Sequence, residues 1–257
     1  MDLGLDGKRA LVLGGTRGLG LACARALAEA GAQVLVNGRS DAGWEEARAG
    51  LRDAKFFRAD VGIEADRRAL CAAADQFGPI SIVVTNAGGP PVGRFEELSS
   101  SQWRSAFETN VLAMIEIVRH FLPQMKARGY GRIINVTSFV VRELYPNMSL
   151  SNGLRVALTG AMGSMAREVA AFGVTVNGML PGLMDTGALQ RVIRDRAQRD
   201  GTSEAAVRAA MAASVPSQRL GEAADFGPLC AFLASPLASY ITGQNICVDG
   251  GLTKNVI

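Results

Sequence analysis

The chain has 257 residues, of which 48% are hydrophobic, and it carries a formal net charge of +3. So small an excess of basic residues does not indicate nucleic acid or a membrane surface as a partner. One histidine, His120, and four scattered cysteines without C-x-x-C spacing leave almost no material for a Ser-His-Asp hydrolase or a zinc enzyme, so we expect no metal.

No linker-like change in composition divides the sequence, which predicts a single domain over residues 1–257. The N-terminal segment lacks the basic and apolar regions of a signal peptide, and no apolar stretch approaches the roughly 20 residues that span a bilayer. Scattered cysteines fit small buried side chains in a reducing cytosol. We therefore expect a cytoplasmic protein that does not enter a membrane.

Short apolar runs alternate along the chain with longer segments of helical periodicity. Strands are predicted at residues 10–13, 34–36, 56–57, 82–84, 133–136, 174–180 and 246–248. Helices are predicted at residues 19–30, 65–77, 103–126 and 156–172. Continuously apolar strands separated by helices are typical of a parallel sheet covered on both faces. The pattern predicts a doubly wound α/β fold, in which ligands bind beyond the carboxyl ends of the strands.

A glycine-rich loop follows the first predicted strand and leads directly into an alanine-rich helix. It reads Gly14-Gly15-Thr16-Arg17-Gly18-Leu19-Gly20. Glycines permit a tight turn and let backbone N–H groups approach a pyrophosphate at the positive end of the helix. Because the loop lies between a predicted strand and a predicted helix, it indicates dinucleotide binding rather than a simple turn.

The end of the second strand bears on the choice between NAD(H) and NADP(H). An acidic residue there would bind the ribose 2′-hydroxyl and repel a 2′-phosphate. The chain instead has Asn37-Gly38-Arg39-Ser40, in which Arg39 can bind a phosphate through two nitrogens. Arg17 in the glycine loop offers a second positive charge. These residues favour NADP(H), while Asp41 keeps NAD(H) open.

Further motifs follow the glycine loop in a fixed order. They are Asp60-Val61, Asn86-Ala87-Gly88, Thr109-Asn110-Val111, Asn135-Val136-Thr137-Ser138, Pro181-Gly182-Leu183-Met184-Asp185-Thr186, Ile241-Thr242-Gly243-Gln244 and Val248-Asp249-Gly250-Gly251. From residue 5 to residue 252 the sequence resembles the short-chain dehydrogenases/reductases, and among these the 3-oxoacyl-(acyl carrier protein) reductases. The resemblance implies a single-domain Rossmann fold with a parallel sheet of about seven strands.

The same resemblance implies roles for individual residues. Asn110 corresponds to the family's helix-borne active-site asparagine, and Ser138 to the serine that orients the substrate. The implied cofactor contacts are the glycine-loop residues Gly14, Thr16, Arg17, Gly18, Leu19 and Gly20, with Arg39, Asp60, Val61, Asn86, Ala87 and Gly88, and the nicotinamide-loop residues Pro181, Gly182, Leu183 and Thr186.

Where the family carries Tyr-x-x-x-Lys, this chain reads Ser151-Asn152-Gly153-Leu154-Arg155. A serine hydroxyl is a far weaker acid than a phenol, so Ser151 cannot readily donate the proton. Arg155 keeps a positive charge that can bind the cofactor's ribose, but a guanidinium does not shuttle a proton. We expect both residues in the active site, with Arg155 also in the cofactor site.

Three alternatives remain for the proton donor. Tyr145 lies in the loop between Ser138 and the helix that bears Ser151, and it is the one phenol placed to reach the nicotinamide, although packing against a neighbour is the simpler interpretation. Glu143 on the same loop would need a strongly raised pKa. A water chain through Asn110 and Ser138 is the third.

Residues 187–218 are rich in helix formers and are expected to form a lid over the substrate. They contain Arg191, Arg194, Arg196, Arg199 and Arg208. Such a basic lid could receive a phosphopantetheine, CoA or carboxylate group, whereas a solvated amphipathic helix pair is the simpler interpretation. The helices at 103–126 and 156–172 resemble those through which family members assemble, which predicts a homotetramer.

Two functions fit these observations. The first is an NADP(H)-dependent reductase of a ketone, such as a 3-oxoacyl thioester or another small carbonyl, and the intact nicotinamide loop favours it. The second is a non-catalytic NADP(H)-binding sensor or the inactive subunit of an active partner, which the missing tyrosine and lysine favour. We take the reductase, with a small-molecule carbonyl or alcohol as substrate, as the main prediction.

Overall fold

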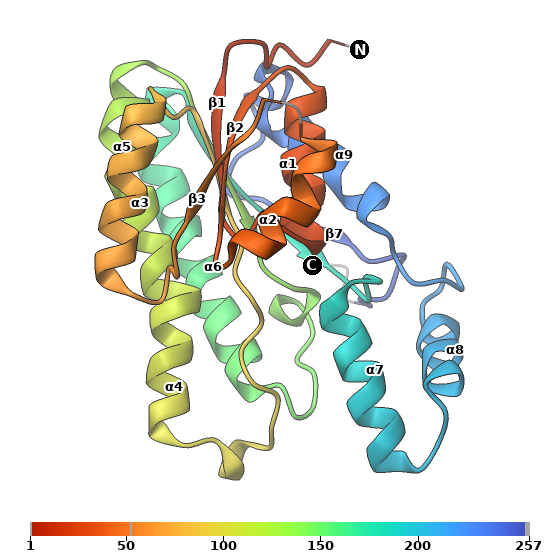
Figure 1. Cartoon of the computed structure of the whole chain (residues 1–257). Helices are drawn as coiled ribbons and strands as arrows, with labels where there is room; N and C mark the ends of the chain where they lie inside the picture. Colours follow the sequence, from red (N-terminus) through yellow and green to blue (C-terminus); the bar gives the residue numbers. More distant parts are fainter. Residues whose placement is uncertain (1, 52, 255–257) are drawn as a thin grey trace.

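The computed structural model describes residues 2–51 and 53–254. Its centre is a seven-stranded sheet of order β3-β2-β1-β4-β5-β6-β7 in which every pair of neighbours is parallel. The strands are β1 (Arg9–Val12), β2 (Gln33–Gly38), β3 (Lys55–Arg58), β4 (Ile82–Thr85), β5 (Gly131–Val136), β6 (Val174–Pro181) and β7 (Asn245–Val248). The doubly wound α/β Rossmann fold is confirmed, and all seven predicted strands are present (Figure 1).

Two hydrophobic cores lie on the two faces of the sheet. In and just after β1, Leu11 and Leu13 belong to one core, whereas Ala10 and Val12 belong to the other. Successive side chains of a strand point to opposite faces, so a strand covered on both sides must be apolar at every position. This requirement explains the continuous apolar runs in the sequence.

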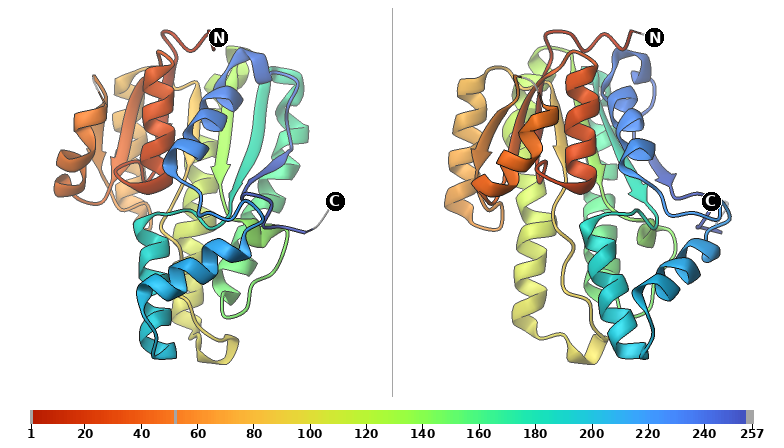
Figure 2. Two further views of the ribbon diagram at one scale, coloured as in Figure 1. Left: turned by 90° about the vertical axis from the view of Figure 1, so that its right-hand side faces the viewer. Right: turned by 45° about the vertical axis from the view of Figure 1, so that its right-hand side comes forward.

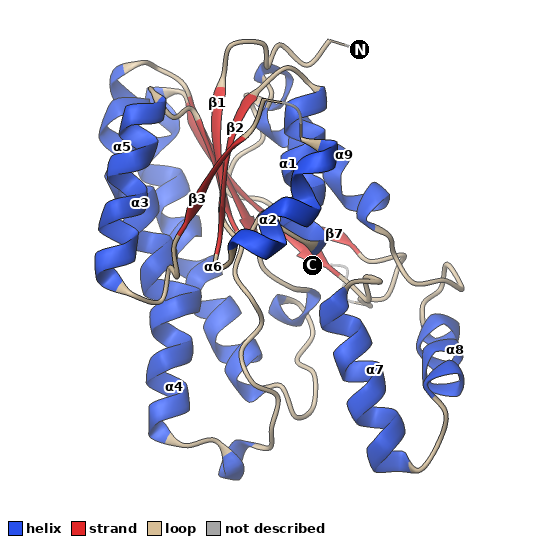
Figure 3. Cartoon of the chain, viewed as in Figure 1, coloured by secondary structure: helices blue, strands red, loops and turns tan. Residues whose placement is uncertain are grey.

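Helices cover both faces of the sheet. On one side lie α1 (Gly18–Glu29), α2 (Asp41–Ala47) and α9 (Ala223–Ala234), and on the other lie α3 (Glu64–Phe77), α5 (Ala113–Ala127) and α6 (Ser149–Val169) (Figures 2 and 3). Short 3₁₀ turns connect them, at Arg48–Gly50, Phe95–Glu97, Phe139–Val141, Ala170–Phe172 and Pro236–Ala238.

The helix predicted at 103–126 has three parts. It begins as α4 (Ser100–Phe107), passes through the π-helical segment Glu108–Leu112, and continues as α5. The helix predicted at 156–172 also differs, because α6 already begins at Ser149. Its first turns contain Asn152 and Gly153, which are weak helix formers, so the periodic pattern emerges only after them.

The predicted lid region forms two helices, α7 (Gly187–Asp200) and α8 (Glu204–Ser214). They extend beyond the carboxyl ends of the strands, in the lower part of Figure 1. A small separate core holds the pair together through Leu189, Ile193, Ala197, Val207, Met211 and Leu220. Residues 215–218 lie in the loop that leads back toward α9. That this pair covers a substrate stays a prediction.

Within residues 2–51 and 53–254, no helix combines the length and apolarity needed to cross a membrane. The same residues contain no group of three or more metal-ligating side chains. All four cysteines are free thiols.

Candidate active site

The glycine loop after β1 forms a tight cradle at the start of α1. Gly14 has a positive φ of 57°, and a Cβ at this position would lie 2.8 Å from the Asn86 amide nitrogen. A Cβ on Gly20 would collide with the Gly14 carbonyl oxygen. Among the described residues, no side chain caps α1, so its first N–H groups are free to bind a phosphate. The geometry fits a pyrophosphate.

Asn86, directly after β4, fixes this cradle from the neighbouring strand. Its side-chain nitrogen donates to the carbonyl oxygens of Leu13 at 3.3 Å and Gly14 at 3.2 Å. Ala87 is half-buried beside it, and a Cβ on Gly88 would meet no atom within 4 Å. The Asn86-Ala87-Gly88 motif therefore supports the glycine loop and leaves open space next to it.

Arg39 directly follows β2, and Arg17 lies in the glycine loop after β1. Arg17 and Arg39 are both exposed, and in the described part of the chain neither forms an ion pair. Asp41, the carboxylate that kept NAD(H) open, instead forms an ion pair with Arg58 at 2.9 Å. Thr16 packs against Gly38, where a Cβ would lie 2.5 Å from the threonine methyl.

The predicted nicotinamide loop lies opposite the glycine loop. A Cβ on Gly182 would lie 2.5 Å from that of Asp249, so the loop packs tightly on the residues after β7. Thr186 precedes α7, and its Cβ lies 3.7 Å from the position a Cβ on Gly18 would take. The structure thus brings Thr186 to the start of α1. Pro181 is buried, and Leu183 is half-buried.

Asn110 lies within the π-helical segment and is 3% exposed. Its side-chain nitrogen donates to the Ala106 carbonyl oxygen at 3.0 Å, while its side-chain oxygen is buried with no partner among the described residues. π-Helical insertions are frequent at functional sites. A buried acceptor without a hydrogen bond is costly, so this oxygen is a natural place for a ligand or water.

Ser138 follows β5 and is half-buried. Its Oγ accepts a hydrogen bond from the Val140 N–H at 3.4 Å, which leaves the hydroxyl hydrogen free to bind a substrate oxygen. The preceding residue, Thr137, has a buried hydroxyl without a partner in the described part of the protein. The polar groups that end β5 are therefore available for binding.

Ser151 and Arg155 lie one turn apart on the same face of α6, and they are 8% and 7% exposed. One guanidinium nitrogen of Arg155 donates to the Val136 carbonyl oxygen at 3.1 Å, and its Nε has no partner among the residues that the structure describes. Burial lowers the pKa of Arg155 from 12.5 to about 10, so the group is still charged at neutral pH. No described carboxylate pairs with it, and such an uncompensated buried charge calls for polar or anionic groups of a ligand.

Comparison with known proteins identifies the family. A family model described as enoyl-(acyl carrier protein) reductase matches residues 14–253. The 3-oxoacyl-[acyl-carrier-protein] reductase FabG of Vibrio cholerae is 35% identical over 97% of this chain and 99% of its own. The chain belongs to the short-chain dehydrogenase/reductase family.

Other relatives extend this comparison. D-beta-hydroxybutyrate dehydrogenase of Rhizobium meliloti is 33% identical over 96% of this chain and 98% of its own. The crystal structure of L-sorbose reductase from Gluconobacter frateurii with NADPH and L-sorbose superimposes with a TM-score of 0.93 at 27% identity, over 100% of both chains. This short-chain dehydrogenase/reductase is accordingly an NAD(P)-dependent oxidoreductase that acts on carbonyl or alcohol groups.

In this short-chain dehydrogenase/reductase, Tyr145 lies at the surface next to the site. Its side chain is 44% exposed, and its ring contacts Phe139 edge to face with 5.8 Å between the centroids. Glu143 accepts a hydrogen bond from the Lys254 N–H at 3.3 Å. Both side chains thus have contacts that do not involve Ser138 or Ser151.

Two features of the site were missed from the sequence. Asn152, beside Ser151, forms hydrogen bonds with both backbone groups of Tyr145. Gly93 forms a parallel bridge with Met148, and its N–H donates to the Asn147 carbonyl oxygen at 3.0 Å. The loop after β4 and the loop after β5 are therefore joined. Of these two features, only Asn152 could have been suspected from the sequence, because an asparagine next to a loop often forms hydrogen bonds with nearby backbone.

The arginines of the lid region are mostly engaged. Arg194 pairs with Glu204 at 3.8 Å, and both Arg196 and Arg199 pair with Asp200 at 3.3 Å. Arg208 on α8 forms a two-pronged ion pair with Asp185 of the nicotinamide loop, and this hydrogen bonding holds the pKa of Asp185 below its usual value. These pairs fit a solvated helix pair, which Arg208 ties to the predicted cofactor site.

Proposed function

We propose that the protein reduces a ketone with NADPH, at an active site where Ser151 and Arg155 stand at the positions of the family's catalytic tyrosine and lysine. The proposed substrate is a small carbonyl, such as a 3-oxoacyl thioester. The observation that carries the proposal is the buried charge of Arg155, which has one backbone partner, no described carboxylate, and Ser151 one turn away.

The residues present fit a dinucleotide. The glycine cradle and the uncapped start of α1 offer space and N–H donors, the Arg155 Nε offers a further donor, and the Asn110 side-chain oxygen offers an acceptor; the described residues leave all of these unused. NADPH, when bound, supplies the hydride. We propose that it is held by Gly14, Thr16, Arg17, Gly18, Leu19, Gly20, Arg39, Asp60, Val61, Asn86, Ala87, Gly88, Arg155, Pro181, Gly182, Leu183 and Thr186.

The preference for the 2′-phosphate rests on Arg17 and Arg39. Both are exposed without an ion pair in the described structure, and Asp41 is engaged by Arg58. A phosphate can bind a guanidinium through two hydrogen bonds, whereas a carboxylate at the same place would repel it.

The chain's own groups then act on the carbonyl. The hydroxyls of Ser138 and Ser151 donate to the carbonyl oxygen, and the Arg155 charge stabilises the negative charge that develops there. For the proton we propose a water chain held by the free side-chain oxygen of Asn110 and by Ser138. Tyr145 and Glu143 are the weaker candidates, because they contact Phe139 and Lys254.

This arrangement predicts a slow but measurable enzyme. A positioned general acid contributes about 10²- to 10⁴-fold to rate, whereas orientation and electrostatic stabilisation persist without it. We further propose that α7 and α8 cover the substrate, and that the protein is a cytoplasmic homotetramer assembled through α4, α5 and α6. Val156 on α6 and Phe107 at the end of α4 are apolar and exposed in the single chain, which fits such an interface.

NADPH oxidation, followed by absorbance, tests the proposal on a panel of 3-oxoacyl thioesters, β-keto esters, quinones and simple ketones. We expect turnover with at least one ketone, and a further loss of rate in Ser138→Ala. Protein that binds NADPH but reduces no member of the panel would contradict the proposal and leave a nucleotide-binding sensor.

A further inference from the structure

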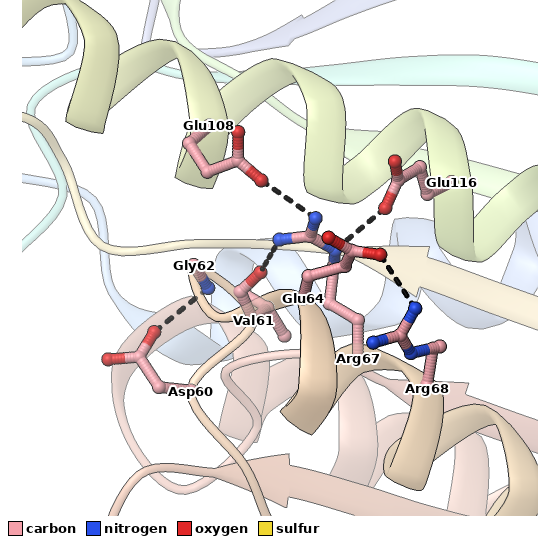
Figure 4. A network of polar contacts seen from close by, with 8 residues as sticks. All are labelled: Asp60, Val61, Gly62, Glu64, Arg67, Arg68, Glu108 and Glu116. Carbon is pink, nitrogen blue, oxygen red and sulfur yellow. Dashed lines mark hydrogen bonds and ion pairs between the residues drawn. The ribbon is translucent and has the colours of Figure 1, made fainter.

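Arg67, in the first turn of α3, is a buried cation that the proposed reaction does not use. Its side chain is 4% exposed, and each of its three nitrogens has a different partner. Nε donates to Glu116 at 2.8 Å, one terminal nitrogen pairs with Glu108 at 2.7 Å, and the other donates to the Val61 carbonyl oxygen at 2.8 Å. Figure 4 shows the guanidinium in the middle of these three groups.

The three partners belong to parts of the protein with different proposed roles. Val61 lies in the loop Asp60–Gly62, and the family resemblance implies that Asp60 and Val61 contact the adenine of the cofactor. Glu108 is the first residue of the π-helical segment that carries Asn110, and Glu116 lies in α5 directly beyond it. Arg67 therefore joins the proposed adenine loop to the backbone on both sides of Asn110.

A second contact joins the same two parts without Arg67. A Cβ on Gly62 would lie 2.8 Å from the hydroxyl oxygen of Thr109, the residue that precedes Asn110. The loop is itself rigid, because the Asp60 side chain accepts from the Gly62 N–H at 2.9 Å and the Asp60 N–H donates to Asp66 at 2.8 Å. A displacement of this loop would therefore press directly on the π-helical segment.

The π-helical segment is the part of this helix most sensitive to such pressure. It contains one extra residue relative to the α-helix on either side, an arrangement that specific contacts must maintain. Relaxation to α-helical geometry shifts the register by one residue and turns a side chain by about 100° around the axis. Asn110 would then lose its bond to the Ala106 carbonyl oxygen and its orientation toward the site.

We propose that Arg67 is a positioning residue that couples the adenosine end of the cofactor site to Asn110. Binding at the loop Asp60–Gly62 stabilises the π-helical segment through Arg67, so that the active-site asparagine is held in register more firmly when the nucleotide is present. The proposal rests on the adenine contact described above, but it does not depend on which carbonyl is reduced.

Hydrogen exchange of the backbone amides of residues 108–112 tests this coupling without any turnover. The probes are 2′-phospho-ADP-ribose and ADP-ribose, which contain the adenosine end and no nicotinamide, and each is used at saturation after its affinity is measured. Energetic coupling between sites usually amounts to about 5- to 150-fold, so in the native protein we expect at least about fivefold slower exchange with nucleotide bound.

Two substitutions distinguish Arg67 from its neighbour. Arg67→Met should abolish the nucleotide-dependent slowing, whereas Arg68→Met should keep it, because Arg68 is exposed and, among the described residues, bonds only to Glu64. Arg67→Lys should not restore the response, since one ammonium cannot reach three separate acceptors. Rescue by lysine would show that charge alone suffices and would overturn the three-point contact.

A further variant keeps the test decisive if Arg67→Met fails to fold. Gly62→Ala leaves Arg67 in place but pushes the loop away from Thr109, and it should weaken the response too.

In a reductase assay, Arg67→Met should lower kcat in the native background but not in an Asn110→Ala background, a non-additivity that general destabilisation does not produce. Nucleotide that binds without changing exchange at 108–112 overturns the inference, whereas failure of both nucleotides to bind overturns the proposed cofactor and the inference with it.

Discussion

The side chain of Asn152 holds the backbone of Tyr145 from two directions. Its Nδ2 donates to the Tyr145 carbonyl oxygen at 2.9 Å, and its Oδ1 accepts from the Tyr145 N–H at 3.4 Å. Because Asn152 is adjacent to Ser151 in α6, the loop after β5 and the helix that carries Ser151 are positioned as one unit.

Replacing Asn152 should loosen that unit. The two lost hydrogen bonds are worth about 1 kcal/mol each, so Asn152→Ala should raise the KM for the carbonyl by up to about 30-fold, with little change in the Kd for NADPH. Asn152→Asp keeps the acceptor and loses the donor, so its KM for the carbonyl should lie between those of the native protein and Asn152→Ala. Steady-state kinetics measure this effect, and an unchanged KM in Asn152→Ala would contradict the positioning role.

Tyr145→Phe removes the phenol and keeps the ring on Phe139. If the proton comes from water held by Asn110 and Ser138, kcat should stay within about twofold of the native value. A general acid would instead cost about 10²- to 10⁴-fold when lost, so the two outcomes are well separated. A large loss in this variant would make Tyr145 the donor and refute the proposed water chain.

The contribution of Arg155 to the Kd for NADPH should not change with pH in the neutral range. Its pKa of about 10 keeps it protonated throughout the neutral range. A lysine at the same depth starts near 10.4, and burial lowers the pKa of an ammonium too. In Arg155→Lys the charge should therefore be lost as the pH rises, and the Kd for NADPH should increase between about pH 7 and 9.

Fluorescence titration of NADPH at several pH values measures this difference. The ionisation of the cofactor's 2′-phosphate, near pH 6, affects both proteins equally and cancels in their ratio. Equal pH dependence of the two proteins would show that the residue at position 155 does not contact the cofactor.

Arg208 should control how firmly α8 is attached to the nicotinamide loop. Arg208→Met removes the ion pair with Asp185 and should raise the KM for NADPH, whereas Arg194→Met, which breaks a pair inside the lid, should not. The pKa of Asp185 is below 3.8 in the folded protein. The ion pair therefore stabilises the attachment of α8 above pH 3.8, and this stabilisation is lost as the pH falls through the lowered pKa. Equal KM values in the two variants would contradict the tether.

The four thiols should differ in reactivity. Cys23 and Cys230 are fully buried, and burial together with Asp75 and Glu116 raises the pKa of Cys71 to about 11. The thiolate is the reactive form, so Cys71 should also be inert near neutral pH. Titration of the native protein with a thiol reagent should modify Cys247 first, and denaturant should expose the remaining three. Rapid modification of Cys71 in the native state would contradict this order.

The fold could be predicted because its strongest signal is local. Ala10–Leu13 and the other runs are apolar at every position, which few structures other than a doubly covered strand require. Helical periodicity alone places the start of α6 too late, because Asn152 and Gly153 have low helix propensity, and tertiary contacts override that preference. The π-helical segment was missed because one extra residue barely disturbs the period of the surrounding helix.

The candidate site was predicted from motif order, which gives residues but not their partners. Placement at the carboxyl ends of neighbouring strands brings Asn86 to Gly14 and Thr186 to Gly18. The pairing of Asp41 with Arg58 and of Arg67 with Glu108 depends on how separate helices and strands pack against one another. No spacing rule contains that information, so the features that bear on cofactor preference and on the register of Asn110 emerge only in three dimensions.

The bridge between Gly93 and Met148 constrains how this protein can acquire new substrates. The two loops that it joins carry exposed apolar side chains, Phe95 on one and Leu144 on the other. A substitution that moves one loop displaces the other, so a change that improves one surface disturbs its neighbour. Selection for a new activity should therefore yield paired substitutions, one in each loop, and exchange of a single loop between relatives should rarely succeed.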